Sequence, residues 1–133
     1  MSSHTVLLTD DEEGVRKFVR TILRNHGFDV VEAADGVEAL ERLRELGPRL
    51  DLLVTDVRMP RMDGVSLAAA SNALYPDLPV LFISGYALDL EAERGRRLQG
   101  VCGYVRKPFL PKDLLEAVRN CLEPPKKNVV TAS

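Results

Sequence analysis

The sequence predicts an α/β fold in which a parallel sheet is covered by helices on both faces. Short apolar runs, rich in β-branched residues, alternate five times with longer helical segments along the chain. Such alternation is typical of βα units, whose parallel strands are joined by right-handed crossovers. The chain has 133 residues, the size of one globular domain. Five strands in so short a chain favour the sheet order 2-1-3-4-5.

The first half of the chain contains two of these units. Thr5–Thr9 is a continuous apolar run, which predicts a buried strand. Apolar residues then recur with helical spacing, so an amphipathic helix is expected to end at 25–27. Residues 28–32 alternate as a strand does. Asp35 and Glu38 form a capping-box pattern that begins a second helix, which Gly47 and the proline after it close.

The second half continues the alternation with three further strands. The short apolar runs that predict them lie at 52–55, 80–83 and 101–105. Helices are expected at 65–75, 88–98 and 111–122. Proline and glycine at 59–64 predict a loop. Pro124-Pro125 is expected to end the packed domain, which gives a domain at 1–123 and a short disordered tail at 124–133.

Composition narrows the classes of function. Lys and Arg total 18 and Asp and Glu total 20, so the net charge of −2 gives no basic field for nucleic acid. No apolar run approaches the ~20 residues that cross a bilayer, and no secretory signal is visible. We therefore expect a cytoplasmic protein that binds neither membrane nor nucleic acid directly. Cys102 and Cys121 are interpreted as small buried residues, because two cysteines make no disulfide framework or zinc site.

Polar residues follow the predicted strands at the edge of the sheet where such folds bind ligands. Asp10 and Asp11 follow the first strand, and Asp56 follows the third, which is its neighbour in the expected order. Ser84 follows the fourth strand and Lys107 the fifth. Three carboxylates in one cleft repel one another unless a cation joins them, and oxygen ligands suit Mg²⁺ or Mn²⁺. Metal, lysine and hydroxyl would together cradle a phosphoryl group, and one carboxylate can itself be the nucleophile.

Four sequence blocks at these strand ends resemble the receiver domain of bacterial response regulators, including the chemotaxis regulators. The blocks are TDD at 9–11, VTDVRMPRMDG at 54–64, FISGY at 82–86 and GYVRKPF at 103–109. The resemblance covers residues 5–122, nearly the whole chain. It implies a flavodoxin-like, doubly wound five-stranded parallel sheet with helices on both faces. It also implies a phosphoacceptor module of a two-component or phosphorelay system.

By this resemblance, four residues form the metal site, and one of them carries the reacting carboxylate. Asp56 would be the phosphoacceptor. Asp11 and Asp56 would bind Mg²⁺ directly, together with the backbone carbonyl of Arg58, and Asp10 would reach the metal through water.

The resemblance also implies the contacts of the phosphoryl group. Ser84 and Lys107 would each contact a phosphoryl oxygen, and the backbone N–H groups of Val57 and Gly85 would add donors. Ser84 and Tyr104 would form the switch, because Tyr104 can turn into the space that Ser84 leaves when it moves toward the phosphoryl group. The peptide bond between Lys107 and the proline after it is expected to be cis.

Some positions depart from the family's common pattern or have a simpler interpretation. Leu110 stands where a polar helix cap is common, so the last helix should begin without a side-chain cap. Arg58 and Tyr86 flank the expected path of the attacking water, and their bulk is hypothesised to lengthen the lifetime of the phosphoryl group. Glu12 and Glu13 are interpreted as acids favoured by the helix dipole.

The resemblance implies a signalling protein that assists its own phosphorylation and dephosphorylation, not a turnover enzyme. The phosphodonor would be a sensor histidine kinase or a histidine phosphotransfer protein. The face of the fourth helix, fifth strand and fifth helix would contact partners and could form a homodimer. One alternative is a degenerate receiver that acts as a protein-interaction module. Another is a flavin or nucleotide binder on the same fold, which the acidic residues at 10–13 disfavour because they would repel a ligand phosphate.

Overall fold

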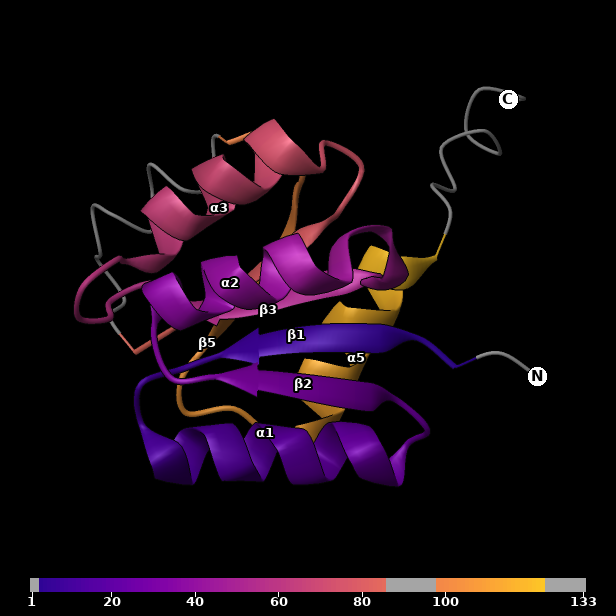
Figure 1. The fold of residues 1–133 in the computed structure, drawn as a ribbon. Coiled ribbons are helices and arrows are strands. Elements are labelled where there is room, and N and C mark those ends of the chain that lie inside the picture. The colour runs from indigo at the N-terminus through magenta and orange to yellow at the C-terminus, as the bar shows by residue number, and fades with distance from the viewer. Residues whose placement is uncertain (1–2, 86–97, 124–133) are drawn as a thin grey trace, which may run out of the picture.

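The structure is a computed structural model and describes residues 3–85 and 98–123 (Figure 1). Five parallel strands form one sheet in the order β2-β1-β3-β4-β5, as predicted. The strands are β1 (Thr5–Thr9), β2 (Asp29–Ala33), β3 (Leu52–Asp56), β4 (Val80–Ser84) and β5 (Val101–Arg106). The helices are α1 (Glu13–Asn25), α2 (Gly36–Leu46), the 3₁₀ turn η1 (Gly47–Arg49), α3 (Gly64–Leu74) and α5 (Pro111–Leu122). The helix expected at 88–98, apart from its last residue, and the tail expected at 124–133 lie outside the described residues.

Helices cover both faces of the sheet, as the alternating pattern predicts. α1 and α5 pack on one face, and α2 and α3 pack on the other (Figure 1). On β1, Val6 and Leu8 join the apolar cluster under α1 and α5, whereas Leu7 joins the cluster under α2 and α3. Central strands are thus buried on both faces, which explains their continuous apolar runs. Within 3–85 and 98–123, no helix has the length and apolar character needed to cross a membrane.

The ends of the elements follow local sequence signals. The Asp35 carboxylate accepts a hydrogen bond from the N–H of Glu38 at 2.9 Å, and the Glu38 carboxylate accepts one from Ala34 at 2.6 Å. The first bond is the expected half of the capping box at the start of α2, whereas Glu38 reaches the residue before the N-cap and not the N–H of Asp35 itself. Gly27 has a φ of 89°, a conformation that L residues rarely adopt, and it lets the chain turn from α1 into β2. The short helix η1 was not predicted.

α5 begins without a side-chain cap, as expected from Leu110. The backbone N–H of Leu110 instead donates to the Asp113 carboxylate at 3.2 Å. This bond is one half of a capping box, and the other half needs an acceptor that a leucine side chain does not have.

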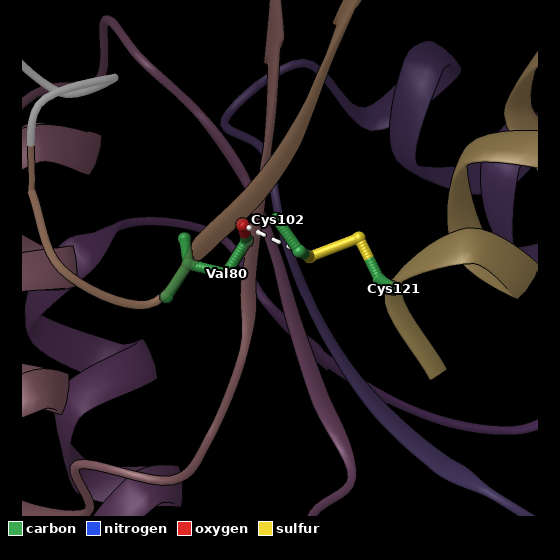
Figure 2. Close-up of a disulfide and its surroundings, with 3 residues drawn as sticks. All are labelled: Val80, Cys102 and Cys121. Atoms are coloured by element: carbon green, nitrogen blue, oxygen red, sulfur yellow. Dashed lines mark hydrogen bonds between the residues drawn. A yellow bond between two sulfur atoms is a disulfide. The ribbon is translucent and has the colours of Figure 1, made fainter. Parts of the chain in front are cut away.

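The prediction for the two cysteines is wrong. Cys102 of β5 and Cys121 of α5 form a disulfide, with their Cα atoms 5.3 Å apart (Figure 2). Cys102 is exposed and Cys121 is half-buried, so neither is a buried core residue. The chain brings the two together by folding α5 back along β5, and a separation of 19 residues carries no signal of that contact.

Candidate functional site

Three carboxylates lie together at the carboxyl edge of the sheet, as the sequence predicts. Asp10 and Asp11 follow β1, and Asp56 ends the neighbouring strand β3. One carboxylate oxygen from each of the three residues lies within 4.8 Å of the others. Asp10 and Asp56 are 1% and 7% exposed, whereas Asp11 is exposed. This set of hard oxygen donors, open to solvent on one side, could hold a divalent cation.

Lys107 lies among these carboxylates. Its Nζ is 3.2 Å from Asp10 Oδ2 and 3.4 Å from Asp56 Oδ2. Its backbone N–H donates to the carbonyl oxygen of Ser84 at 2.8 Å, which joins the loop after β5 to the end of β4. The peptide bond that follows Lys107 is cis, as the resemblance implied.

Burial makes negative charge unfavourable at this site. Burial and the neighbouring charge of Asp10 raise the pKa of Asp56 to about 6, although Lys107 and the N–H of Val57 act in the opposite direction. Burial also raises the pKa of Asp10. Burial alone would lower the pKa of Lys107, but the charges of Asp56 and Asp10 outweigh it and raise that pKa. A further cation would therefore favour the charged forms of both buried carboxylates.

The backbone around Asp56 is fixed by hydrogen bonds. The N–H of Val57 donates to Asp56 Oδ1 at 2.8 Å, and the Thr55 hydroxyl donates to the Asp56 carbonyl oxygen at 2.9 Å. The N–H of Gly64 donates to the carbonyl oxygen of Val57 at 2.7 Å. A Cβ at Gly64 would collide with the Asp56 carbonyl oxygen. Only glycine at position 64 lets the start of α3 lie this close to Asp56. In the sequence Gly64 indicated only a loop, so this role was not predicted.

Glu12 belongs to the site, which its interpretation as a simple helix acid missed. It is the N-cap residue of α1, but its side chain makes no capping hydrogen bond. Its Oε1 lies 3.2 Å from Lys107 Nζ, and its N–H donates to Asp10 Oδ1 at 2.9 Å. Glu13 lies in the first turn of α1, where a helix acid is expected. Glu12 and Lys107 are 95 positions apart, so no local pattern could have joined them.

An open cavity of about 450 Å³ brings most of the predicted residues together. It is lined by Asp11, Glu12, Asp56, Arg58, Gly85 and Lys107. Ser84 is buried at the end of β4, next to Gly85. Tyr104 packs half-buried against the cluster under α2 and α3. Tyr86 lies outside the described residues.

The comparisons with known proteins point to one family. The family model of the response regulator receiver domain matches residues 6–119. The sensor kinase CckA of Brucella abortus (strain 2308) is 44% identical over 121 residues, which cover 91% of this chain and 13% of that protein. The response regulator receiver protein CpdR of the same organism is 34% identical over 122 residues, which cover 88% of this chain and 95% of CpdR.

Solved structures agree with the sequence relatives. The receiver domain of the hybrid histidine kinase CckA has a TM-score of 0.76 at 37% identity, covering 90% of this chain and 99% of that one. The CheY-like receiver domain protein of Methanospirillum hungatei JF-1 has a TM-score of 0.82 at 29% identity, covering 91% and 94%.

The described site and the extent of the match lead to the same conclusion. The acidic cluster and Lys107 stand at the strand ends that carry the four resembling blocks. The matched region includes β2 to β5 in full, β1 apart from its first residue, and most of α5. The chain belongs to the response regulator receiver domain family, and it is a phosphoacceptor module of two-component signalling.

Proposed function

We propose that Asp56 takes a phosphoryl group from a phosphohistidine of a sensor histidine kinase or a histidine phosphotransfer protein. The observation that carries this proposal is the cluster of Asp10, Asp11 and Asp56 around Lys107 Nζ in an open cavity. A donor of this kind acts in the cytoplasm, and we propose the same location for this chain.

The surroundings of Asp56 suit phosphoryl transfer. An Asp56 carboxylate oxygen forms a bond to phosphorus while the phosphorus–nitrogen bond of the donor breaks. Lys107 Nζ, 3.4 Å from Asp56 Oδ2, can pair with a phosphoryl oxygen. The N–H of Val57 already donates to the Asp56 carboxylate, and Ser84 and Gly85 offer a hydroxyl and a backbone N–H from the neighbouring strand end. These donors would stabilise charge on the transferred group.

Asp11 and Asp56 would bind Mg²⁺ or Mn²⁺ directly, with the backbone carbonyl of Arg58 as a further ligand. Asp10 would bind it through water. When bound, the ion supplies positive charge that stabilises the oxygens of the phosphoryl group. The raised pKa of Asp10 and of Asp56 supports this site, because both carboxylates lack enough positive charge from Lys107 alone.

Ser84 and Tyr104 are proposed to form a switch, and the pairing of β4 with β5 supports this proposal. Tyr104 is paired with Phe82, and both pack in the cluster under α2 and α3. Ser84 is two positions beyond Phe82 on the same strand, so its side chain points to the same face of the sheet as Tyr104. Movement of Ser84 toward a phosphoryl group on Asp56 would open space on that face for the Tyr104 ring.

An apolar surface beside the site is proposed as the docking place of the phosphodonor. Phe18 is 46% exposed, and its ring centroid lies 5.9 Å from that of Phe109. A cavity of about 430 Å³ is lined by these two rings together with Gly85 and Lys107, which also line the cavity of Asp56. This shared lining supports the proposal that a protein bringing a histidine to Asp56 rests on this surface. The β5 and α5 face, with the expected fourth helix, is proposed for the output partner or a homodimer.

The test is phosphorylation by a small donor. Wild-type protein incubated with Mg²⁺ and acetyl phosphate or a phosphoramidate should gain the mass of one phosphoryl group, in a base-labile bond. Asp56→Asn should gain none. Asp77→Asn is the matched control, because Asp77 is exposed and lies just before the start of β4, whereas Asp56 stands at the end of β3. Equal labelling of the Asp56→Asn protein would refute the assignment.

The docking surface and the lifetime hypothesis have separate tests. Phe18→Ala should slow transfer from a phosphorylated histidine phosphotransfer protein and leave labelling by acetyl phosphate unchanged. Equal loss in both assays would mean that Phe18 supports the fold and not the binding of the donor.

Arg58→Asn should speed loss of the phosphoryl group if Arg58, which lines the cavity, obstructs the attacking water. An unchanged rate would remove that hypothesis, and Tyr86→Glu tests the second flanking position.

A further inference from the structure

We propose that Cys102 and Cys121 are a redox-modification site, at which a reversible disulfide fastens α5 to β5. The bridge joins β5 to α5, with Cα atoms 5.3 Å apart (Figure 2). The chain has two cysteines, so the pair competes with no third thiol of its own. This modification is separate from the transfer proposed for Asp56.

A bulge in β5 places Cys102 and Gly103 on one face of the strand, toward α5. Val80 is paired with Val101, but the next residue, Leu81, is paired with Gly103. Cys102 is therefore an extra residue in β5, without a partner of its own in the register with β4. Successive residues of a regular strand point to opposite faces, whereas a bulge re-aims the side chain at the inserted position.

Gly103 lies beside the bridge. A Cβ at Gly103 would lie 2.9 Å from the side chain of Leu81 and 3.7 Å from Cys121 Sγ. Gly103 therefore faces α5, as Cys102 does, while Tyr104 after it packs on the opposite face. Two neighbouring residues of β5 thus share one face, and the absence of a side chain at Gly103 leaves room for Leu81 beside the bridge.

The reduced form also fits these surroundings. Cys102 Sγ lies 3.3 Å from the carbonyl oxygen of Val80, drawn as a dashed line in Figure 2. As a thiol, Cys102 can donate a hydrogen bond to that oxygen. Cys121 packs against the apolar cluster under α1 and α5, where a neutral thiol is well accommodated. Both redox states are therefore compatible with one backbone, so the bond can form and break in the folded chain.

The oxidant we propose is a small-molecule disulfide such as oxidised glutathione. The thiolate of Cys102, the more exposed of the two, attacks one glutathione sulfur and releases one glutathione thiolate. The thiolate of Cys121 then attacks Cys102 Sγ and releases the second. The two protein thiols together lose two electrons and two protons, and one molecule of oxidised glutathione gains them to become two molecules of reduced glutathione.

The bridge is placed to act on a surface and not on the phosphoryl chemistry. Cys102 stands at the start of β5, whereas Lys107 follows its end. A groove of about 320 Å³ between β5 and α5 is lined by Tyr104, Arg106 and Asn120, and Cys121 follows Asn120. The disulfide thus fixes the spacing of β5 and α5 beside this groove. Oxidation should slow amide exchange in the last turn of α5 and leave Asp56 labelling by acetyl phosphate unchanged.

The test is a redox titration of the whole chain. Reduced protein is equilibrated with graded ratios of oxidised to reduced glutathione, in native buffer and in urea, then quenched with acid and alkylated. Mass spectrometry then counts free thiols. In native buffer the intramolecular disulfide should form at an oxidised-to-reduced ratio at least tenfold lower than in urea. If both conditions need the same ratio, or if the native chain gives only glutathione adducts or intermolecular dimers, the proposal is wrong.

Two variants sharpen the titration. Cys121→Ser should carry a single glutathione adduct on Cys102, whereas Cys102→Ser should resist modification because Cys121 is half-buried. Gly103→Ala keeps both thiols but puts a methyl group 2.9 Å from the Leu81 side chain and in contact with Cys121 Sγ, so the displacement of Leu81 in this space should move the native titration toward more oxidising ratios. Circular dichroism confirms that each variant is folded. An unmoved titration in folded Gly103→Ala protein would contradict the assigned role of that space.

Discussion

Asp56 is subject to two opposing requirements. As a nucleophile it must be ionised, yet burial and the charge of Asp10 raise its pKa to about 6. In the unfolded chain its pKa returns toward the ordinary value of 3.8. The folded chain therefore keeps a proton through a pH window in which the unfolded chain has released it. Stability contributed by that proton is lost as the pH rises through this window, from about 4 to about 6.

Asp56→Asn should therefore stabilise the metal-free protein at pH 7.5. The amide removes a buried charge, and a shift of this size corresponds to on the order of 1 to 3 kcal/mol of unfolding free energy. Urea unfolding in EDTA measures the difference, and the gap should narrow at pH 4.5, where Asp56 is largely protonated. Asp77→Asn should change little at either pH. A less stable Asp56→Asn protein at pH 7.5 would show that pairing with Lys107 outweighs the cost of burial.

Gly64 is the second residue on which the site depends. Gly64→Ala would drive a methyl group into the Asp56 carbonyl oxygen, so we expect a loss of about 1 to 3 kcal/mol and slower phosphorylation of Asp56. Gly14→Ala is the matched control, because a Cβ at Gly14 in α1 meets no atom within 4 Å. That substitution should stabilise the protein by about 0.5 to 1 kcal/mol. Urea unfolding and acetyl phosphate labelling measure both variants.

At the scale of elements, a substitution at the start of α5 can make the fold more stable. Leu110→Ser would add a side-chain acceptor for the N–H of Asp113, which now donates to the carbonyl oxygen of Leu110 at 3.0 Å. The Asp113 carboxylate would keep its bond from the N–H of residue 110. A completed capping box should raise the unfolding free energy by about 0.5 to 1 kcal/mol. Leu110→Ala, which removes the same apolar side chain without adding an acceptor, should not. Equal stability of the two variants would mean that the hydroxyl makes no capping bond.

Most elements could be predicted from the sequence because their signals are local. The apolar run of β1, the capping box before α2 and the proline at the start of α5 each depend on a few adjacent residues. The bulge at Cys102 was not predicted, although Gly103 within residues 101–105 is a sequence signal that often marks one. Its register shift exists only relative to β4. The disulfide depends on that shift and on the path of α5, so it was missed for the same reason.

At the scale of the whole molecule, the site was predictable because strand order follows from the fold class. Once β1 and β3 are neighbours, Asp10, Asp11 and Asp56 must meet at one edge. The pairing of Glu12 with Lys107 required the actual path of the loop after β5. Fold class thus places strand ends, whereas an individual side chain on a loop is placed by contacts that sequence patterns do not contain.

Metal binding should stabilise the whole fold, since the three carboxylates come together only when β1 and β3 pair. Mg²⁺ at a hundred times its Kd should add about 2.7 kcal/mol to the unfolding free energy, and EDTA should remove that gain. Thermal unfolding across a Mg²⁺ series measures the effect. Asp11→Asn should weaken the Mg²⁺ dependence, whereas Asp77→Asn should keep it. An Mg²⁺ dependence that survives Asp11→Asn unchanged would place the ion elsewhere.

The disulfide should also act on global stability. Closing a loop between residues 19 apart restricts the unfolded chain, which corresponds to about 3 kcal/mol in the chain-entropy treatment. Oxidised wild-type protein should therefore unfold at a higher urea concentration than reduced protein. Cys102→Ser should unfold at one midpoint in both redox conditions, and a redox-dependent midpoint in that variant would assign the effect to another cause.

The bulge has a consequence for the behaviour of the protein at high concentration. β5 is an edge strand, and the open backbone groups of such a strand can template the addition of a strand from another molecule. At Cys102 the ladder of β5 is interrupted, so an incoming extended segment could not hold one register along the whole strand. The irregularity that carries the bridge therefore also protects this edge of the sheet from β-type aggregation.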